Sequence, residues 1–154
     1  MSIFQSLDTT GSALTAQRLR MDVISSNMAN AETTRARQVN GEWEPYRRKS
    51  VVLTAQEGSG SFASHLNAAI GSSSKSAGNG VKVTRISEDN ETPFKLSYDP
   101  SNPDADEQGY VRLPNIDSLK EMTDLMSATR SYEANVTVFN ANKAMLTKAL
   151  EIGK

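Results

Sequence analysis

The stretch from Ser118 to Ile152 contains neither glycine nor proline, and its apolar residues recur at steps of three and four. At ~1.5 Å per residue, this stretch predicts a helix of about 52 Å. A typical globular helix has only ~11–12 residues. Ser118 and Glu121 fit an S-x-x-E capping box, and Asp117 is an equally good N-cap by residue type, so the helix start is predicted to within one residue.

The apolar residues of this helix form two lines that lie more than a right angle apart at ~100° per residue. The first line alternates steps of three and four, which is typical of a helix that packs along another helix. The second line finds no partner in the chain, and contiguous apolar patches of this kind mark interfaces. The first line is Met122, Leu125, Tyr132, Val136, Phe139, Leu146 and Leu150, interrupted by Thr129 and Lys143; the second is Ala134, Val138, Ala141, Met145, Ala149 and Ile152.

A second helix is predicted from about Phe4 to Asn30, with Gly11 weakening its first turns by about 1 kcal/mol relative to alanine. It is the natural partner for the first apolar line of the C-terminal helix. The two ends of the chain are therefore expected to pair as an antiparallel, coiled-coil-like hairpin. Its packing residues stand one heptad apart at Leu7, Leu14, Met21 and Met28, with Ile24 in the companion position.

Between the two helices the composition favours short strands and turns. Strands are predicted at 81–86, 94–98 and 109–113, and 43–53 is predicted to be a strand or hairpin arm. Gly/Ser-rich pieces within 57–80 leave the local structure of that part open. The predicted class is α+β, with an N-terminal helix in 1–34, a β-rich middle module with Gly/Ser-rich loops in 35–115, and a C-terminal helix in 116–154.

The sequence offers little for catalysis, and we predict no enzyme, no cofactor and no metal site. His65 is the only histidine, and cysteine is absent. The acidic stretch 102–107 fails as an EF-hand, because Glu107 stands where glycine is needed and Leu113 where a bidentate glutamate is needed; a turn with solvated charges is favoured. For the basic triplet Arg47–Lys49 an exposed strand face is the favoured interpretation, and binding to an acidic partner surface is the alternative.

Charge and hydropathy exclude two further classes of partner. The formal net charge is −1, so no basic excess exists to neutralise the phosphates of a nucleic acid. No apolar run of ~18 residues exists that would span a membrane. The N-terminal residues lack the charged and apolar regions of a cleavable secretory signal, so passage out of the cytoplasm would need another route.

Three segments of the chain together resemble the bacterial flagellar rod and hook axial proteins. ALTAQRLRMDVISSNMANAETTR (Ala13 to Arg35) resembles the N-terminal signature of that family, and EMTDLMSATRSYEANVTVFNANKAMLTKALEIGK (Glu121 to Lys154) its C-terminal signature. Between them, YDPSNPDADEQGYVRLPNID (Tyr98 to Asp117) is similar to a stretch of proximal-rod members. The short chain also fits a proximal-rod subunit, because distal-rod and hook relatives carry larger insertions.

This resemblance implies a non-enzymatic structural subunit of the flagellar basal body. Its terminal helices would pack with many other subunits into a tube that transmits torque, and its middle module would contact neighbouring basal-body proteins. The subunit would cross the cytoplasmic membrane through the flagellar type III export apparatus, with Phe4 and Leu7 as candidates for the residues that the apparatus recognises. By position the resemblance gives helix-packing roles to Leu14, Met21, Ile24, Met28, Met122, Leu125, Tyr132, Val136, Phe139 and Leu146.

A soluble coiled-coil adaptor or chaperone with a β module is the alternative function. It predicts a helical hairpin that is well folded in dilute solution. A rod subunit instead predicts terminal helices that become ordered on assembly. Hydrogen exchange over residues 125–150 of the monomer distinguishes the two hypotheses.

Overall fold

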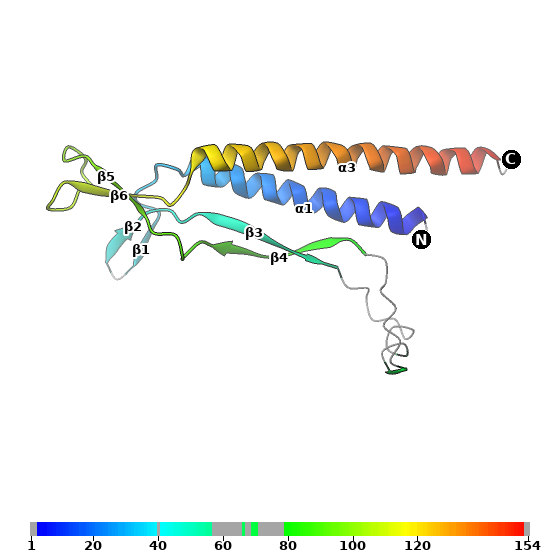
Figure 1. The fold of residues 1–154 in the computed structure, drawn as a ribbon, viewed down its shortest axis with the longest axis horizontal. Helices are drawn as coiled ribbons and strands as arrows, with labels where there is room; N and C mark the ends of the chain where they lie inside the picture. Colours follow the sequence, from blue (N-terminus) through cyan, green and yellow to red (C-terminus); the bar gives the residue numbers. More distant parts are fainter. Residues whose placement is uncertain (1–2, 40, 57–65, 67–68, 71–78, 153–154) are drawn as a thin grey trace. The chain divides into compact units, whose positions relative to one another are not determined.

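The computed structural model describes residues 3–39, 41–56, 66, 69–70 and 79–152. The long helices α1 (Ile3–Ala29) and α3 (Ser118–Ile152) come from the two ends of the chain (Figure 1). The α+β class predicted from the sequence is confirmed. The described strands between the helices are β1 (Arg37–Val39), β2 (Glu42–Glu44), β3 (Lys49–Ala55), β4 (Val81–Glu88), β5 (Lys95–Tyr98) and β6 (Tyr110–Leu113).

The strands form two-stranded sheets, in which β1 pairs with β2, β3 with β4 and β5 with β6. The β1–β2 and β5–β6 pairs are antiparallel, with Gln38 opposite Trp43 in the first. The strands predicted at 81–86, 94–98 and 109–113 are confirmed as β4, β5 and β6. The predicted strand at 43–53 is interrupted between β2 and β3, where Pro45 has no backbone N–H to donate to a ladder.

Helix α3 begins and ends at the residues predicted for it. Asp117 is its N-cap, because its Oδ1 accepts a hydrogen bond from the Leu119 N–H at 3.1 Å. The Asp117 carbonyl accepts the first helical bond, from the Glu121 N–H at 2.9 Å. The carboxylate of Glu121 is engaged elsewhere, so the capping-box alternative that starts at Ser118 does not form.

The chain divides into two compact units, each built from segments far apart in the sequence. We call the first the terminal unit, because it contains both chain ends (1–18, 53–84 and 130–154). The second, comprising 19–52 and 85–129, we call the junction unit. Both helices and the β3–β4 pair contribute to each unit. The predicted division into 1–34, 35–115 and 116–154 instead follows chain order, and it stays a prediction.

The buried apolar side chains gather mainly in the junction unit. Val23 and Ile24 of α1 lie there with Val111 of β6 and Ala128 of α3, all of them buried. In the terminal unit Ala16 is buried, and the other buried side chains of its helices are polar. The apolar core is therefore small and unevenly distributed between the units.

In the terminal unit the start of β4 docks on α1 through a close backbone approach. Gly80 has a φ of +105°, a region that favours glycine, and a Cβ at this position would clash with the Ser12 hydroxyl. The Val81 N–H donates to Ser12 Oγ at 3.1 Å. Gln5 Nε2 adds a bond of 3.1 Å to Asn79 Oδ1. These contacts attach the N-terminal half of α1 to the β3–β4 pair.

In the junction unit the two helices run antiparallel, as predicted. Asn27 near the end of α1 bonds to Glu121 in the first turn of α3, and Met21, earlier in α1, meets Thr129 later in α3. In the terminal unit Asn142 Nδ2 donates to Ser6 Oγ at 2.7 Å. The predicted pairing of the terminal helices is therefore present, and polar side chains take part in it in both units.

Candidate functional site

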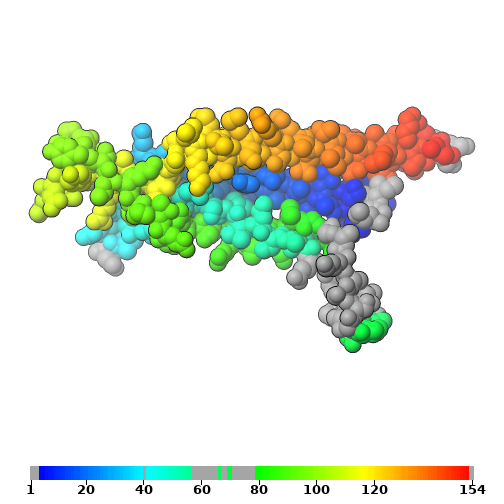
Figure 2. Space-filling model, in the orientation of Figure 1, coloured from blue at the N-terminus to red at the C-terminus, as the bar shows by residue number. Residues whose placement is uncertain are grey.

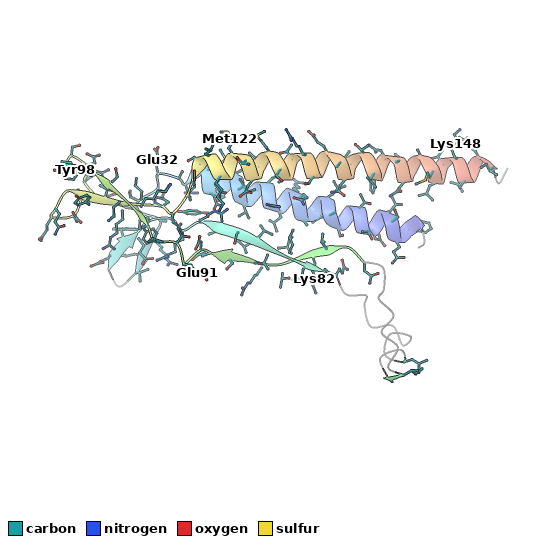
Figure 3. All side chains as sticks on the ribbon, viewed as in Figure 1. Glu32, Lys82, Glu91, Tyr98, Met122 and Lys148 are labelled. Atoms are coloured by element: carbon teal, nitrogen blue, oxygen red, sulfur yellow. The ribbon has the colours of Figure 1, made fainter. Side chains whose placement is uncertain are left out.

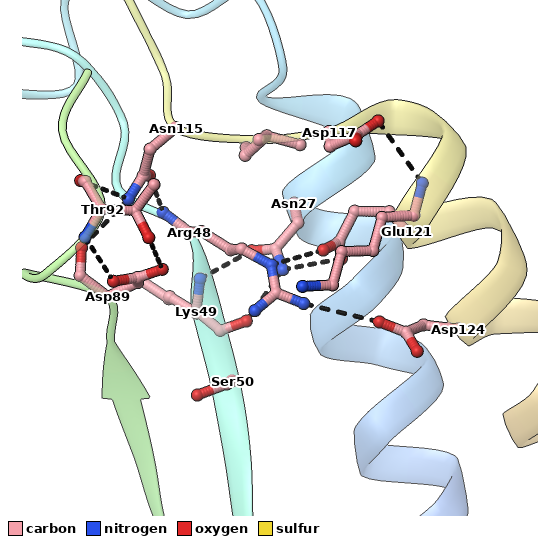
Figure 4. A network of polar contacts seen from close by, with 12 residues as sticks. Asn27, Arg48, Lys49, Ser50, Asp89, Thr92, Asn115, Asp117, Glu121 and Asp124 are labelled. Atoms are coloured by element: carbon pink, nitrogen blue, oxygen red, sulfur yellow. Dashed lines mark hydrogen bonds and ion pairs between the residues drawn. The ribbon is translucent and has the colours of Figure 1, made fainter. Parts of the chain in front are cut away.

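The centre of the junction unit is a buried polar cluster around Glu121. The side chain of Glu121 is 0% exposed. Its Oε1 accepts a hydrogen bond from Arg48 Nε at 2.6 Å, and its Oε2 accepts one from Asn27 Nδ2 at 3.0 Å (Figure 4). A buried charge is strongly destabilising unless it is paired and hydrogen-bonded. Both oxygens of this carboxylate have such a partner. We call Asn27, Arg48, Asn115 and Glu121 the polar junction.

Asn27 links α1 to the first residue of β3. Its Nδ2 donates to the Lys49 carbonyl at 2.8 Å, and its Oδ1 accepts from the Lys49 N–H at 3.0 Å. The side-chain amide thus pairs with both backbone groups of Lys49, as the backbone of a neighbouring strand would. The Tyr46 hydroxyl also donates to Asn27 Oδ1, at 3.3 Å. The amide of this fully buried side chain therefore bonds to α3 and to the chain around β3.

Arg48 extends the polar junction along α3. Besides Glu121, its guanidinium reaches Asp124 Oδ2 at 3.5 Å through Nη2. Asp124 also lies 3.8 Å from Nη2 of Arg20 on α1. The side chain of Arg48 is 21% exposed, so its charge is compensated by this pair of carboxylates more than by water. Arg48 therefore connects the start of β3 to α3, and Asp124 in turn lies near Arg20 of α1.

The basic triplet that contains Arg48 binds its own chain. Arg47 lies over the Phe94 ring at 4.4 Å from the ring centroid, and Lys49 Nζ lies 5.4 Å from the Tyr46 centroid. Such cation–π contacts are worth about 0.5–1 kcal/mol at exposed sites. Arg48 fits neither predicted interpretation of the triplet, which were an exposed strand face and binding to an acidic partner. Its guanidinium is mostly covered, and the carboxylates that it meets belong to α3 of the same chain.

Asn115 completes the polar junction just before α3. Its Oδ1 accepts from the Arg48 N–H at 2.8 Å, and its Nδ2 donates to the carbonyls of Asp89 and Thr92 at 3.1 and 3.2 Å. Hydrogen bonds from the backbone N–H and the hydroxyl of Thr92 hold the pKa of the Asp89 carboxyl below its ordinary value. Asn115 thus joins the start of β3 to the loop that follows β4.

A groove of about 420 Å³ lies elsewhere in the junction unit, lined in part by Trp43 and Tyr110. One wall holds the Arg35–Asp104 ion pair, in which Arg35 Nε donates to Asp104 Oδ1 at 2.6 Å. Arg35, and then the Thr34 hydroxyl, hold the pKa of Asp104 below its ordinary value. The turn predicted at 102–107 is confirmed, but its charges are not all solvated, because Asp104 pairs with Arg35. In the described part of the chain, no group of three or more His, Cys, Asp or Glu side chains could hold a metal ion.

The residues predicted to pack or to assemble differ widely in exposure within the single chain. Of those on α1, Ile24 is buried and Leu7, Leu14, Met21 and Met28 are half-buried. On α3, Leu125, Tyr132, Val136 and Leu146 are half-buried. The exposed residues of the predicted set are Met122, Val138, Phe139, Met145, Leu150 and Ile152.

The exposed members of that set lie on the surface of α3. Figure 2 shows the orange-to-red part of this helix forming the surface on the face in view, and Figure 3 shows Met122 pointing outward from its first turns. Exposure reaches 58% for Met145 and 86% for Ile152. We call Val138, Met145, Leu150 and Ile152, which all lie in the terminal unit, the apolar helix surface. The part of these residues in assembly stays a prediction.

The most buried residues of α3 are ones that the apolar lines omitted. Glu121 and Ala128 are 0% exposed and Asn142 is 6% exposed. These positions are spaced by multiples of seven residues, and Asn135, which completes the series, is half-buried. The same heptad spacing in the sequence could have revealed them. Apolar periodicity does not reveal this series, because its residues are small or polar.

Comparison with known proteins places this helical pair in a family. A family model described as "Flagella basal body rod protein" matches residues 7–37, and one described as "Flagellar basal body rod FlgEFG protein C-terminal" matches residues 107–152. Flagellar basal-body rod protein FlgC of Bacillus subtilis is 63% identical over 154 residues, which cover 100% of both chains. The chain belongs to the FlgC family. The FlgC proteins of Escherichia coli and Borreliella burgdorferi are 42% and 41% identical, over 100% and 99% of this chain and 100% and 98% of theirs.

Membership of the FlgC family confirms the predicted resemblance to flagellar rod proteins and favours a structural rod subunit over the adaptor or chaperone. The matched segments contain α1 from Leu7 onward and all of α3, so they include Asn27 and Glu121 of the polar junction. None of the described helices is both long enough and apolar enough to cross a membrane.

Proposed function

We propose that this chain is a structural subunit of the flagellar basal-body rod and that it assembles through its terminal helices into a tube that transmits torque. Its partners are other rod subunits and neighbouring basal-body proteins. In transit, the flagellar type III export apparatus carries it across the cytoplasmic membrane. The protein works by packing and stiffness rather than by catalysis.

The observation that carries this proposal is the apolar helix surface. Val138 is 49% exposed, Met145 58%, Leu150 74% and Ile152 86%. Fully burying a side chain of this size is worth about 1.5–3 kcal/mol. A subunit that assembles into a multi-subunit tube covers this surface with neighbouring chains, and the burial then favours assembly.

Charged substitutions on the apolar helix surface test the proposal. Val138→Asp and Met145→Asp each place a carboxylate where a neighbouring subunit is expected to pack. Each variant is expected to abolish incorporation into rods and motility, because a buried unpaired charge is strongly unfavourable. The free protein should keep the parental circular dichroism and denaturation midpoint, since both side chains face water in the single chain.

Asn140→Asp is the matched control, because it adds the same charge at an exposed polar position of α3. It should assemble and support swimming. Normal motility in both Val138→Asp and Met145→Asp would contradict the proposal.

A further inference from the structure

We propose that the polar junction sets the register in which α1 and α3 of one chain pair, rather than adding to the stability of the pair. The inference concerns contacts inside the junction unit. It therefore holds or fails independently of the proposed assembly through the apolar helix surface. The residues that act are Asn27 on α1, Glu121 on α3 and Arg48 at the start of the β3 segment.

The apolar repeats of the two helices leave their register open. Leu7, Leu14, Met21 and Met28 repeat every seven residues along α1. Leu125, Tyr132, Phe139 and Leu146 repeat every seven residues along α3. A shift of one helix by seven residues therefore sets apolar residues against apolar residues again. In coiled coils, a single buried polar position is what distinguishes such registers.

The polar junction does not repeat in this way. A shift of seven residues along α3 would place Ala128 opposite Asn27 in place of Glu121. The carboxylate of Glu121 would then lose the Asn27 amide, which now donates to it at 3.0 Å. Because a buried carboxylate oxygen without its hydrogen bond is more unfavourable than a missing methyl contact, the shifted register is disfavoured by these few atoms.

Arg48 and Lys49 belong to neither helix, and their hydrogen bonds connect the residues of the polar junction. Its N–H donates to Asn115 Oδ1 at 2.8 Å, and its carbonyl accepts from the Asp89 N–H at 2.8 Å. The next residue, Lys49, receives both bonds of the Asn27 amide. The β3 segment thus fixes Asn27 and Glu121 along their helices at once, which a direct contact between two sliding helices would not do.

The burial of the Arg48 and Glu121 charges is consistent with a role in selecting the helix register. Replacing a buried, well-paired ion pair with apolar residues of similar size is often neutral or stabilising, whereas removal of one partner is harmful. Arg48→Met/Glu121→Met removes both charges and keeps two long apolar side chains at this place. The double variant is expected to fold with a denaturation midpoint equal to or above that of the parent.

Cross-linking in the full chain reads the register, and the absence of cysteine makes the labels unique. Met21→Cys/Thr129→Cys reports the observed register, in which Met21 Sδ and Thr129 Oγ1 lie 3.6 Å apart. Met21→Cys/Val136→Cys reports the register shifted by seven residues. Each pair is treated with a short bifunctional maleimide both in dilute solution and in assembled rods, and the intrachain product is quantified in both backgrounds.

In the parental background the 21–129 product should dominate. In Arg48→Met/Glu121→Met the ratio of the 21–129 product to the 21–136 product is expected to fall at least tenfold. The matched control is Arg35→Met/Asp104→Met, which removes an ion pair of the same charges away from the polar junction and should leave the ratio unchanged.

An unchanged ratio in Arg48→Met/Glu121→Met would overturn the proposal. Loss of the folded state in that variant would also overturn it, because the cluster would then be a requirement for stability. A parent that yields no 21–129 product in either state would overturn it as well, since no register would exist to be set. Failure of rod assembly by the surface variants has no bearing on these measurements.

Discussion

The two compact units differ in the polar contacts that join their two helices. In the junction unit, a carboxylate, two amides and a guanidinium are drawn inward and bonded to one another. In the terminal unit, apolar residues of α3 such as Met145 and Ile152 face water, and one bond from Asn142 to Ser6 links the two helices among the described side-chain contacts. Helix α3 contributes to both units, so the difference does not arise from its backbone.

The difference between the units corresponds to two roles that we assign to α3, pairing within the chain and contact with other chains. Directional polar bonds accept only particular partners, and those of the junction unit come from the same chain. Apolar contact is non-directional and scales with buried area, so the terminal unit offers a surface that other chains can cover. We propose that the chain specifies its own pairing at one end of α3 and assembles with other chains through the other end.

Removal of the Glu121 carboxylate should have the largest effect on the isolated protein. Glu121→Ala leaves Arg48 and Asn27 without their buried partner, and we expect the free energy of unfolding to fall by about 3 kcal/mol. Met145→Ala in the apolar helix surface should lower it by less than about 0.5 kcal/mol. Denaturant unfolding measures both. Equal losses in the two variants would contradict the contrast between the units.

Removal of the Asn142–Ser6 bond between the two helices of the terminal unit should have a smaller effect. Asn142→Ala breaks the bond to Ser6, which is worth about 1 kcal/mol, and the higher helix propensity of alanine offsets part of that loss. Thr147→Ala is the control, because that exposed hydroxyl donates to the Lys143 carbonyl of its own helix. A loss for Asn142→Ala as large as that for Glu121→Ala would show that the terminal unit also depends on buried polar bonds.

The smallest expected effect is on the acid sensitivity of the junction unit. Arg35 and Thr34 lower the pKa of Asp104 in the folded protein, so its contribution to stability is present at pH values above about 4 and is lost as the pH falls through the lower folded pKa. Asp104→Asn should therefore unfold with a weaker dependence on pH below about 4. Denaturation midpoints between about pH 2 and about pH 6 test this, and parallel curves for variant and parent would contradict it.

Local sequence signals predicted the elements well. The absence of glycine and proline and the presence of Asp117 placed the bounds of α3, and alternation of apolar and polar residues placed β4. They did not predict the polar junction, because Arg48 and Glu121 are 73 residues apart in the sequence. An arginine after a proline-containing turn and a glutamate in a first helical turn are each typical of solvent-exposed positions.

The sequence by itself determined which segments are helix and strand, the apolar repeats of the two helices and, through its terminal signatures, the family. Only the tertiary structure decided that Glu121, Asn27 and Asn142 are buried while Met145 and Ile152 are exposed. The physical reason lies in desolvation. A polar side chain can be buried only where other segments supply matching donors and acceptors, and that match exists in space and cannot be read from the hydropathy of the chain.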